Sequence, residues 1–214
     1  GQAYIRTKKN KLDKAFPTFM SQEDLNCSLV GVCDLFDVNA ELGLDASQND
    51  VRPGRKSNGS ATRYRHYSEL LAQDDIDGVI IATPDHWHSR ITIDAAKAGK
   101  HVYCEKGLTR TFQEALDVYD TIKETGMILQ LGHQNRQVEA NDKAKRIIDQ
   151  GLLGPINLVE LTTNRNSPWG AWVWNIHKDG NNKTIDWDLF QEPSPNKIPF
   201  GEEALKRFFR WRCW

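Results

Sequence analysis

The chain has 214 residues, of which 39% are hydrophobic and 27% are charged. Its 28 Lys and Arg residues nearly balance its 29 Asp and Glu residues, so the formal net charge is -1. This balance argues against a general nucleic-acid-binding protein, which needs a basic excess or a basic face. The composition is that of a globular protein, and apolar runs such as 78–82 fall far short of the roughly 20 residues that cross a bilayer. We therefore expect neither a nucleic-acid partner nor a membrane partner.

The four cysteines, at positions 27, 33, 104 and 213, lack the spacing of a zinc site. Cys33 and Cys104 lie in or beside apolar runs, so we expect buried free thiols that act as small hydrophobic side chains. The first 16 residues carry basic side chains but no apolar segment after them, so no secretion signal is visible. A signal already removed would leave no trace, and the compartment stays open, with the cytoplasm as the default.

Apolar runs of strand length alternate with helical patterns along the first 130 residues. We expect buried strands over 28–34, 78–83, 101–104 and 127–132, and helices over 67–73, 90–98 and 111–125. Pro84 should end the second strand because proline lacks a backbone N–H, and Gly99 and Gly126 stand where helices end. The polar, basic stretch 48–66 is interpreted as a surface loop.

The helix expected over 111–125 has its apolar side chains spaced for one face: Phe112, Ala115, Leu116, Tyr119 and Ile122. Strands that alternate with helices in this way predict an α/β protein with a doubly wound parallel sheet.

The pattern changes after residue 136. A helix is expected over 138–150, ending at Gly151, and NLVELTT at 157–163 alternates like a half-exposed antiparallel strand. Six of the seven tryptophans lie at or after Trp169. Their rings either form the core of a loop-rich segment or, for a residue such as Trp172, a wall on which a sugar ring stacks.

The first predicted strand closes on Asp34. In a dinucleotide-binding sheet such a carboxylate binds the adenosine ribose, although any strand can end in a solvated acid. The glycine-rich turn that this site needs upstream is missing, and a doubly wound sheet without its central strand has unpaired ladder groups. We expect the first strand and most of the glycine loop to lie upstream of Gly1, with Gly1 as the last glycine of that loop.

Two strand ends carry the most specific motifs: TPxxxH, with Thr83, Pro84 and His88, and EKG at 105–107. Three further motifs follow: GHQNR at 132–136, GLLGPI at 151–156 and DWDLF at 186–190. Together they resemble the glucose–fructose oxidoreductase, inositol dehydrogenase and rhizopine-catabolism family (Gfo/Idh/MocA), in which EKP stands in place of EKG.

The resemblance implies a Rossmann-type fold and an NAD(P)-dependent enzyme that transfers hydride to or from a sugar, glycoside or cyclitol hydroxyl. It places Lys106 beside the nicotinamide and the substrate, where an ammonium group stabilises developing alkoxide charge. Glu105 would orient that lysine, close on the cofactor or form a surface ion pair, and Arg136 is either structural or substrate-binding. The other implied cofactor residues are Thr83, Pro84, His88 and Gln134.

Asp34 is followed by Leu35 and not by a cation that would hold a 2′-phosphate, which favours NAD over NADP. The basic stretch that contains Arg52, Arg55, Lys56, Arg63 and Arg65 is either a solvated surface run or a loop that reaches a phosphate. His86 and His88 have no acid or cysteine partner at metal-ligand spacing, so no metal is expected. His88 is interpreted as a hydrogen-bonding residue at a helix start or as a proton shuttle.

The resemblance divides the chain into a nucleotide-binding domain, 1–136, and the beginning of an α+β substrate and oligomerisation domain with an open antiparallel sheet, 137–214. It implies a homo-oligomer, a dimer or a tetramer. The Asp and His that such proteins carry on a helix of the second domain have no match here, so the chain alone is expected to be inactive. Two alternatives stay open: an NAD-dependent glycosidase that acts by transient oxidation and elimination, and a non-catalytic binding or scaffold relative.

Overall fold

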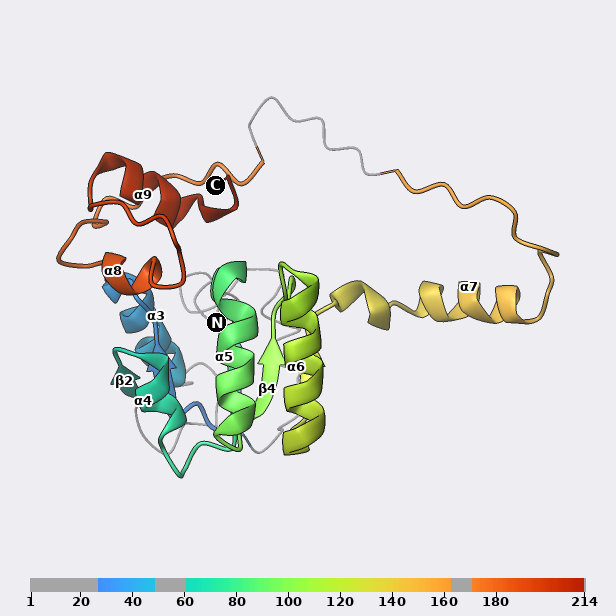
Figure 1. Cartoon of the computed structure of the whole chain (residues 1–214), viewed down its shortest axis with the longest axis horizontal. Coiled ribbons are helices and arrows are strands. Elements are labelled where there is room, and N and C mark those ends of the chain that lie inside the picture. Colours follow the sequence, from blue (N-terminus) through green and yellow to red (C-terminus); the bar gives the residue numbers. More distant parts are fainter. Residues whose placement is uncertain (1–26, 49–60, 163–170, 214) are drawn as a thin grey trace.

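The computed structural model describes residues 27–48, 61–162 and 171–213 (Figure 1). Gly1, the basic residues Arg52, Arg55 and Lys56, and the tryptophans Trp169 and Trp214 lie outside these ranges.

Parallel strands alternate with helices through the first two thirds of the described chain. The elements in chain order are β1 (Gly31–Cys33), α3 (Asp37–Ser47), β2 (Thr62–Tyr64), α4 (Tyr67–Leu71), β3 (Gly78–Ile81), α5 (Asp85–Lys97), β4 (His101–Cys104), α6 (Phe112–Thr125) and β5 (Leu129–Leu131). This alternation confirms the predicted α/β class.

The strands form two parallel sheets. β1 pairs with β2, with Gly31 opposite Thr62, and β4 lies between β3 and β5, with Gly78 opposite His101. Helices α5 and α6 lie side by side next to β4 (Figure 1). Among the described residues no ladder joins β1 to β3, so each sheet keeps an open edge. The expectation of a further central strand upstream of Gly1 stays a prediction.

Local sequence signals explain the ends of these elements. The Thr111 side chain accepts a hydrogen bond from the Glu114 backbone N–H at 3.1 Å, and the Glu114 carboxylate accepts one from the Thr111 N–H at 3.3 Å, a reciprocal cap that starts α6. Gly126 then ends the helix with a φ of 71°, a left-handed conformation that suits glycine. The core between the helices and the larger sheet contains Ile81, Trp87, Ile91, Ala95, Val102 and Cys104.

The structure corrects two of the predicted elements. β2 lies in the stretch interpreted as a loop: its three residues, with Arg63 at the centre, are too short and too polar to give an apolar pattern, yet they pair with β1. Helix α5 begins at Asp85 and not at Arg90, directly after Pro84. The HWHS sequence has no apolar periodicity, but Trp87, His88 and Ser89 are all buried on this added turn.

The apolar stripe predicted on α6 is not its buried face. Phe112 is 79% exposed and Tyr119 is 60% exposed, whereas Val118 and Thr121 are buried. α6 packs against α5, and sequence spacing shows only that a helix has an apolar side, not which neighbour it meets. The pattern therefore predicted the helix correctly but did not identify the residues that α6 buries.

No strand forms over 157–162 in the described structure, where Leu158, Val159 and Leu161 are exposed. An alternating segment becomes a strand only when a neighbouring backbone pairs with it, and no described residue does. The antiparallel sheet expected after residue 136 is likewise not seen: the antiparallel pairing in the described chain is the bridge between Phe36 and Ile185.

The last third of the chain contains η1 (Gln134–Gln137), α7 (Glu139–Asp149), α8 (Trp187–Phe190), α9 (Glu202–Phe209) and η2 (Trp211–Cys213). Helix α7 has no buried residue and extends away from the sheets (Figure 1), whereas α8 and α9 pack around Phe36 in a second core. Trp187 belongs to this core, so the core interpretation holds for that tryptophan. None of the described helices is both long and apolar enough to cross a membrane.

Candidate functional site

Three loops leave the carboxyl ends of β3, β4 and β5 side by side. The Glu105 backbone N–H donates to the Ile81 carbonyl at 2.9 Å, and the Gly132 N–H donates to the Cys104 carbonyl at 2.8 Å. These bonds continue the parallel ladder by one residue beyond each strand. They bring the TPxxxH, EKG and GHQNR motifs to one edge of the sheet, the edge at which open α/β sheets bind their ligands.

Lys106 follows β4 and is exposed at this edge. Its ammonium group forms no hydrogen bond or ion pair with a residue of the described ranges, which leaves it available to a ligand. The Glu105 carboxylate instead accepts from the Tyr103 hydroxyl at 3.1 Å and from the Lys106 backbone N–H at 3.4 Å. Glu105 therefore stabilises the backbone of the turn. Its carboxylate forms no ion pair with the Lys106 ammonium group.

His88 lies inside the first turns of α5 and is 1% exposed. Its Nδ1 atom is 2.8 Å from the Gly107 carbonyl, and its Nε2 atom is 2.7 Å from the Thr83 carbonyl. One buried ring thus connects the turn after β3 to the turn after β4. This arrangement agrees with the hydrogen-bonding interpretation of His88 and leaves neither ring nitrogen free to shuttle a proton to a ligand.

Thr83 and Pro84 form the connection between β3 and α5, with Pro84 as the N-cap residue of the helix. The Thr83 hydroxyl oxygen is buried and has no hydrogen-bond partner among the described residues. A buried hydroxyl without a partner costs free energy. The Thr83 hydroxyl thus has hydrogen-bonding capacity that the described residues leave unused.

Asp34 directly follows β1, and its carboxylate accepts from the Phe36 backbone N–H at 2.8 Å. Burial raises the pKa of Asp34, and the Phe36 N–H, the Asn39 side chain and Arg63 oppose that rise. The side chain is therefore a desolvated hydrogen-bond acceptor at the end of a parallel strand.

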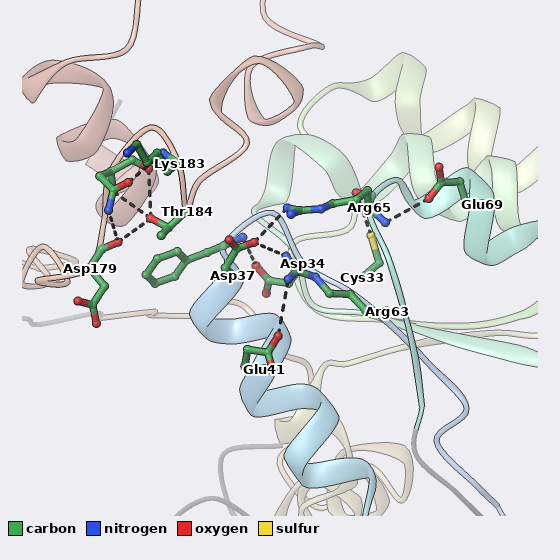
Figure 2. A network of polar contacts seen from close by, with 12 residues as sticks. Cys33, Asp34, Asp37, Glu41, Arg63, Arg65, Glu69, Asp179, Lys183 and Thr184 are labelled. Atoms are coloured by element: carbon green, nitrogen blue, oxygen red, sulfur yellow. Dashed lines mark hydrogen bonds and ion pairs between the residues drawn. The ribbon is translucent and has the colours of Figure 1, made fainter.

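Two arginines of the predicted basic stretch lie next to Asp34 (Figure 2). Arg63 is paired with Asp37, and Arg65 donates to the same carboxylate at 3.0 Å. The hydrogen bond from Arg63 lowers the pKa of Asp37. Sequence reasoning missed Asp37, the first residue of α3; the signal that could have found it is a second acid three residues after Asp34.

Gln134 and Arg136 lie on η1, directly after the Gly132 contact, and both are exposed. The structure thus brings them to the same edge as Lys106 along the chain, without a side-chain contact that assigns either a role. Trp172 is 42% exposed, and the Arg212 guanidinium lies 4.8 Å from its ring centroid.

The C-terminal segment reaches the start of α5. Arg212 donates to Asp85 at 3.2 Å, and the Phe190 carbonyl of α8 accepts from the Trp87 indole N–H at 3.2 Å, with His86 Nε2 at the same distance. Burial lowers the pKa of His86. No group of three or more His, Cys, Asp or Glu side chains suited to a metal occurs in the described parts of the chain.

The comparisons with known proteins identify the family of the chain. The Gfo/Idh/MocA family model, described as an oxidoreductase family with an NAD-binding Rossmann fold, matches residues 20–133, more than half of the chain. The levoglucosan dehydrogenase of Pseudarthrobacter phenanthrenivorans is 36% identical over 120 residues, which cover 56% of this chain and 29% of that protein. The scyllo-inositol 2-dehydrogenase (NAD(+)) of Bacillus subtilis is 40% identical over 106 residues, which cover 49% of this chain and 31% of that protein.

Solved structures show the same fold. The myo-inositol 2-dehydrogenase from Lactobacillus plantarum matches with a TM-score of 0.52 and 27% identity, over 68% of this chain and 41% of that one. The WlbA dehydrogenase from Bordetella pertussis, solved with NADH and UDP-GlcNAcA, matches with a TM-score of 0.51 and 26% identity, over 70% of this chain and 38% of that one. The chain spans less than half the length of each of these four relatives. Because the family model matches more than half of the chain, the chain belongs to the Gfo/Idh/MocA oxidoreductase family.

Proposed function

We propose that this chain carries the cofactor-binding part of an NAD-dependent dehydrogenase that acts on a hydroxyl of a sugar or cyclitol. The observation that carries this proposal is the position of Lys106: it follows β4 at the carboxyl edge, between the Thr83 turn and the Gly132 turn, with its ammonium group unengaged by the described residues.

The residues at this edge fit a dinucleotide. The Thr83 hydroxyl lacks a partner, and Thr83 stands where the pyrophosphate or a ribose would lie. Asp34 directly follows β1, the position of the acid in dinucleotide sites that bind the ribose hydroxyls through a carboxylate. Arg63 and Arg65 are both held by Asp37, so neither is free to pair with a 2′-phosphate, which supports NAD over NADP.

Lys106 would hold and polarise the reacting oxygen of the substrate. When bound, the nicotinamide ring supplies the hydride acceptor. The ammonium group of Lys106 would donate a hydrogen bond to the carbinol oxygen and stabilise the negative charge that develops there. The proton of the hydroxyl then needs a base, which we place outside the described residues.

The substrate class rests on the relatives. Levoglucosan and inositols are named for the two dehydrogenases above, and both are polyhydroxylated rings. We propose a substrate of that type, with Arg136 and the exposed face of Trp172 as candidate contacts. We further propose the division into a nucleotide-binding domain, 1–136, and the beginning of a substrate and assembly domain, 137–214, which would pair in a homo-oligomer.

Titration with NADH of the full-length protein that contains this chain tests the proposal, with energy transfer from tryptophan as the signal. We expect saturable binding, weaker binding of NADPH, and a loss of roughly tenfold or more in NADH affinity for Asp34→Ala. Asp75→Ala is the matched control, because Asp75 precedes β3 and is an exposed carboxylate at the opposite edge of the sheet. No NADH binding, or equal losses in the two variants, would contradict the proposal.

Lys106→Met separates binding from chemistry. We expect NADH affinity to change by no more than about twofold, because the lysine acts on the substrate oxygen. In the full-length protein that contains this chain and supplies the base, the rate of NADH formation from NAD with myo-inositol or levoglucosan should fall by about 100-fold or more, the usual cost of removing a group that stabilises a developing oxyanion.

A further inference from the structure

His88 makes two contacts that a neutral imidazole cannot both satisfy. Its ring nitrogens lie 2.8 Å and 2.7 Å from the carbonyl oxygens of Gly107 and Thr83. Both partners are acceptors only. A neutral imidazole carries one N–H, so its second nitrogen would direct a lone pair at a carbonyl lone pair at hydrogen-bond distance.

Water cannot relieve this conflict, because His88 is 1% exposed. Exchanging the ring by a 180° flip does not help either, since it would place C–H groups against both carbonyls and leave both nitrogens elsewhere. In the imidazolium form each nitrogen donates one hydrogen bond, and both bonds are charge-assisted. The geometry therefore selects the protonated ring.

We propose that His88 is a positioning residue that, as an imidazolium, ties the Thr83 turn to the Lys106–Gly107 turn and so holds the two cofactor-binding loops in register. This inference rests on the proposed function, because it assigns a task to the site that binds the nicotinamide cofactor. Loss of the proton breaks one of the two bonds. The released turn is then either the one that carries Lys106 or the one that carries the Thr83 hydroxyl.

Some charged groups on the segments around His88 favour its imidazolium form, and others oppose it. Those on the segments that meet His88 are Asp85 and His86 of α5, Cys104 at the end of β4, Glu105, Lys106 and Arg110 of the following turn, and Glu114 of α6, which pairs with Arg110. The carboxylates favour the imidazolium, whereas Lys106, Arg110 and the burial of the ring oppose it. His86 does not compete for the charge, because burial lowers its pKa, and the Cys104 thiol stays neutral because burial raises its pKa to about 11.

The protonation state can be measured without any cofactor. Proton–nitrogen correlation spectra of the chain labelled with ¹⁵N-histidine distinguish an imidazolium from either neutral tautomer, and His88→Asn identifies the His88 signals by their loss. We expect both ring nitrogens of His88 to carry protons at pH 7. A single protonated nitrogen at that pH would overturn the proposal.

Two variants then test the positioning role by NADH titration from pH 6 to pH 9. Asn places its amide near the Nδ1 position and Gln near the Nε2 position, so His88→Asn retains the bond to Gly107 and His88→Gln retains the bond to Thr83. For the wild type we expect NADH affinity to fall as the pH rises and the ring loses its proton. Each variant should bind NADH roughly tenfold more weakly at pH 6, the effect of one lost charge-assisted bond, and should show no such fall with pH.

His86→Gln is the matched control. His86 lies two residues before His88 on α5 and contacts a single carbonyl, that of Phe190. It should keep the pH dependence of the wild type. Circular dichroism of each variant shows whether it is folded, and the NMR measurement on the wild type stands even if a variant is not. Wild-type affinity that does not change with pH would overturn the positioning role. Absence of NADH binding at every pH, with a doubly protonated His88, would instead overturn the proposed function and leave the tie between the turns intact.

Discussion

Phe36 pairs with Ile185 in an antiparallel bridge that fastens the C-terminal segment to the end of β1. The Asp37 N–H donates to the Thr184 carbonyl and the Asp186 N–H donates to the Leu35 carbonyl, each at 2.9 Å. Phe36 is 2% exposed, and its ring meets those of His177, Phe208 and Phe209 edge-on, at centroid distances of 5.4, 6.1 and 5.5 Å. The segment that carries Asp34 is thus held by residues about 150 positions away in the sequence.

Phe36→Ala should be among the most destabilising single changes in the chain. Removal of a fully buried phenylalanine leaves a cavity and costs about 3–5 kcal/mol of the free energy of unfolding. Urea unfolding followed by tryptophan fluorescence measures this loss. Phe112→Ala is the control, because Phe112 is 79% exposed, and it should change the free energy of unfolding by no more than about 0.5 kcal/mol. Similar losses in the two variants would contradict the burial described here.

Asp34→Asn should stabilise the fold at neutral pH while it weakens NADH binding. Burial raises the pKa of Asp34, so the folded chain holds a proton there more readily than the unfolded chain does. The free energy of unfolding of the wild type therefore falls as the pH rises from the ordinary carboxyl pKa of 3.8 to the raised pKa of the folded chain. Above that raised pKa the full loss of stability from burying the ionised carboxylate is present. Asparagine cannot ionise, and its carbonyl oxygen can still accept from the Phe36 N–H.

The measurement for Asp34 is the urea midpoint of both proteins from pH 4 to pH 7. The two midpoints should be closest at pH 4, and the variant should gain relative to the wild type as the pH rises. A variant that is less stable than the wild type at pH 7 would show that hydrogen bonds to the carboxylate, and not its burial, dominate at this position.

Elements with a strong local signal could be predicted from the sequence. The strand His101–Cys104 has the predicted bounds, and Phe112–Thr125 differs by only the cap residue Thr111. The TPxxxH and EKG motifs also predicted the site edge, since each follows a parallel strand and parallel strands end at the same edge.

Features that depend on distant partners could not be predicted. β2 is a strand because β1 lies beside it, and the stretch 157–162 is not a strand because no described residue pairs with it. The two contacts of His88 depend on carbonyls whose orientation only the folded chain fixes. The pairing of Arg63 and Arg65 with Asp37 likewise requires the start of α3 to lie beside β2.

Asp37→Ala should shift the cofactor preference toward NADPH. The change frees the Arg63 and Arg65 guanidinium groups that Asp37 now holds beside Asp34 (Figure 2). A freed guanidinium can pair with a 2′-phosphate, so the ratio of NADPH to NADH affinity should rise roughly tenfold at low salt and less at 1 M salt, where exposed charges are screened. Glu41→Ala is the control: Glu41 is 69% exposed and 3.8 Å from Arg63. An equal shift in both variants would show that net charge alone sets the preference.

Three cysteines should react with a maleimide at different rates, because both the pKa of a thiol and its exposure control how fast it reacts. Burial raises the pKa of both Cys33 and Cys104 to about 11 from an ordinary value of 9.0, and that alone reduces the reactive thiolate about 100-fold at pH 7.5. Cys104 is also 0% exposed, whereas Cys33 is half-buried and Cys213 is exposed. Among these three cysteines we expect Cys213 to be modified first, Cys33 much more slowly and Cys104 last.

Mass spectrometry of timed samples gives the three rates. Urea should make them equal, because the unfolded chain has neither the raised thiol pKa nor the burial. Modification of Cys104 as fast as Cys213 in the folded chain would mean that the core between β4 and α5 opens far more readily than its packing allows.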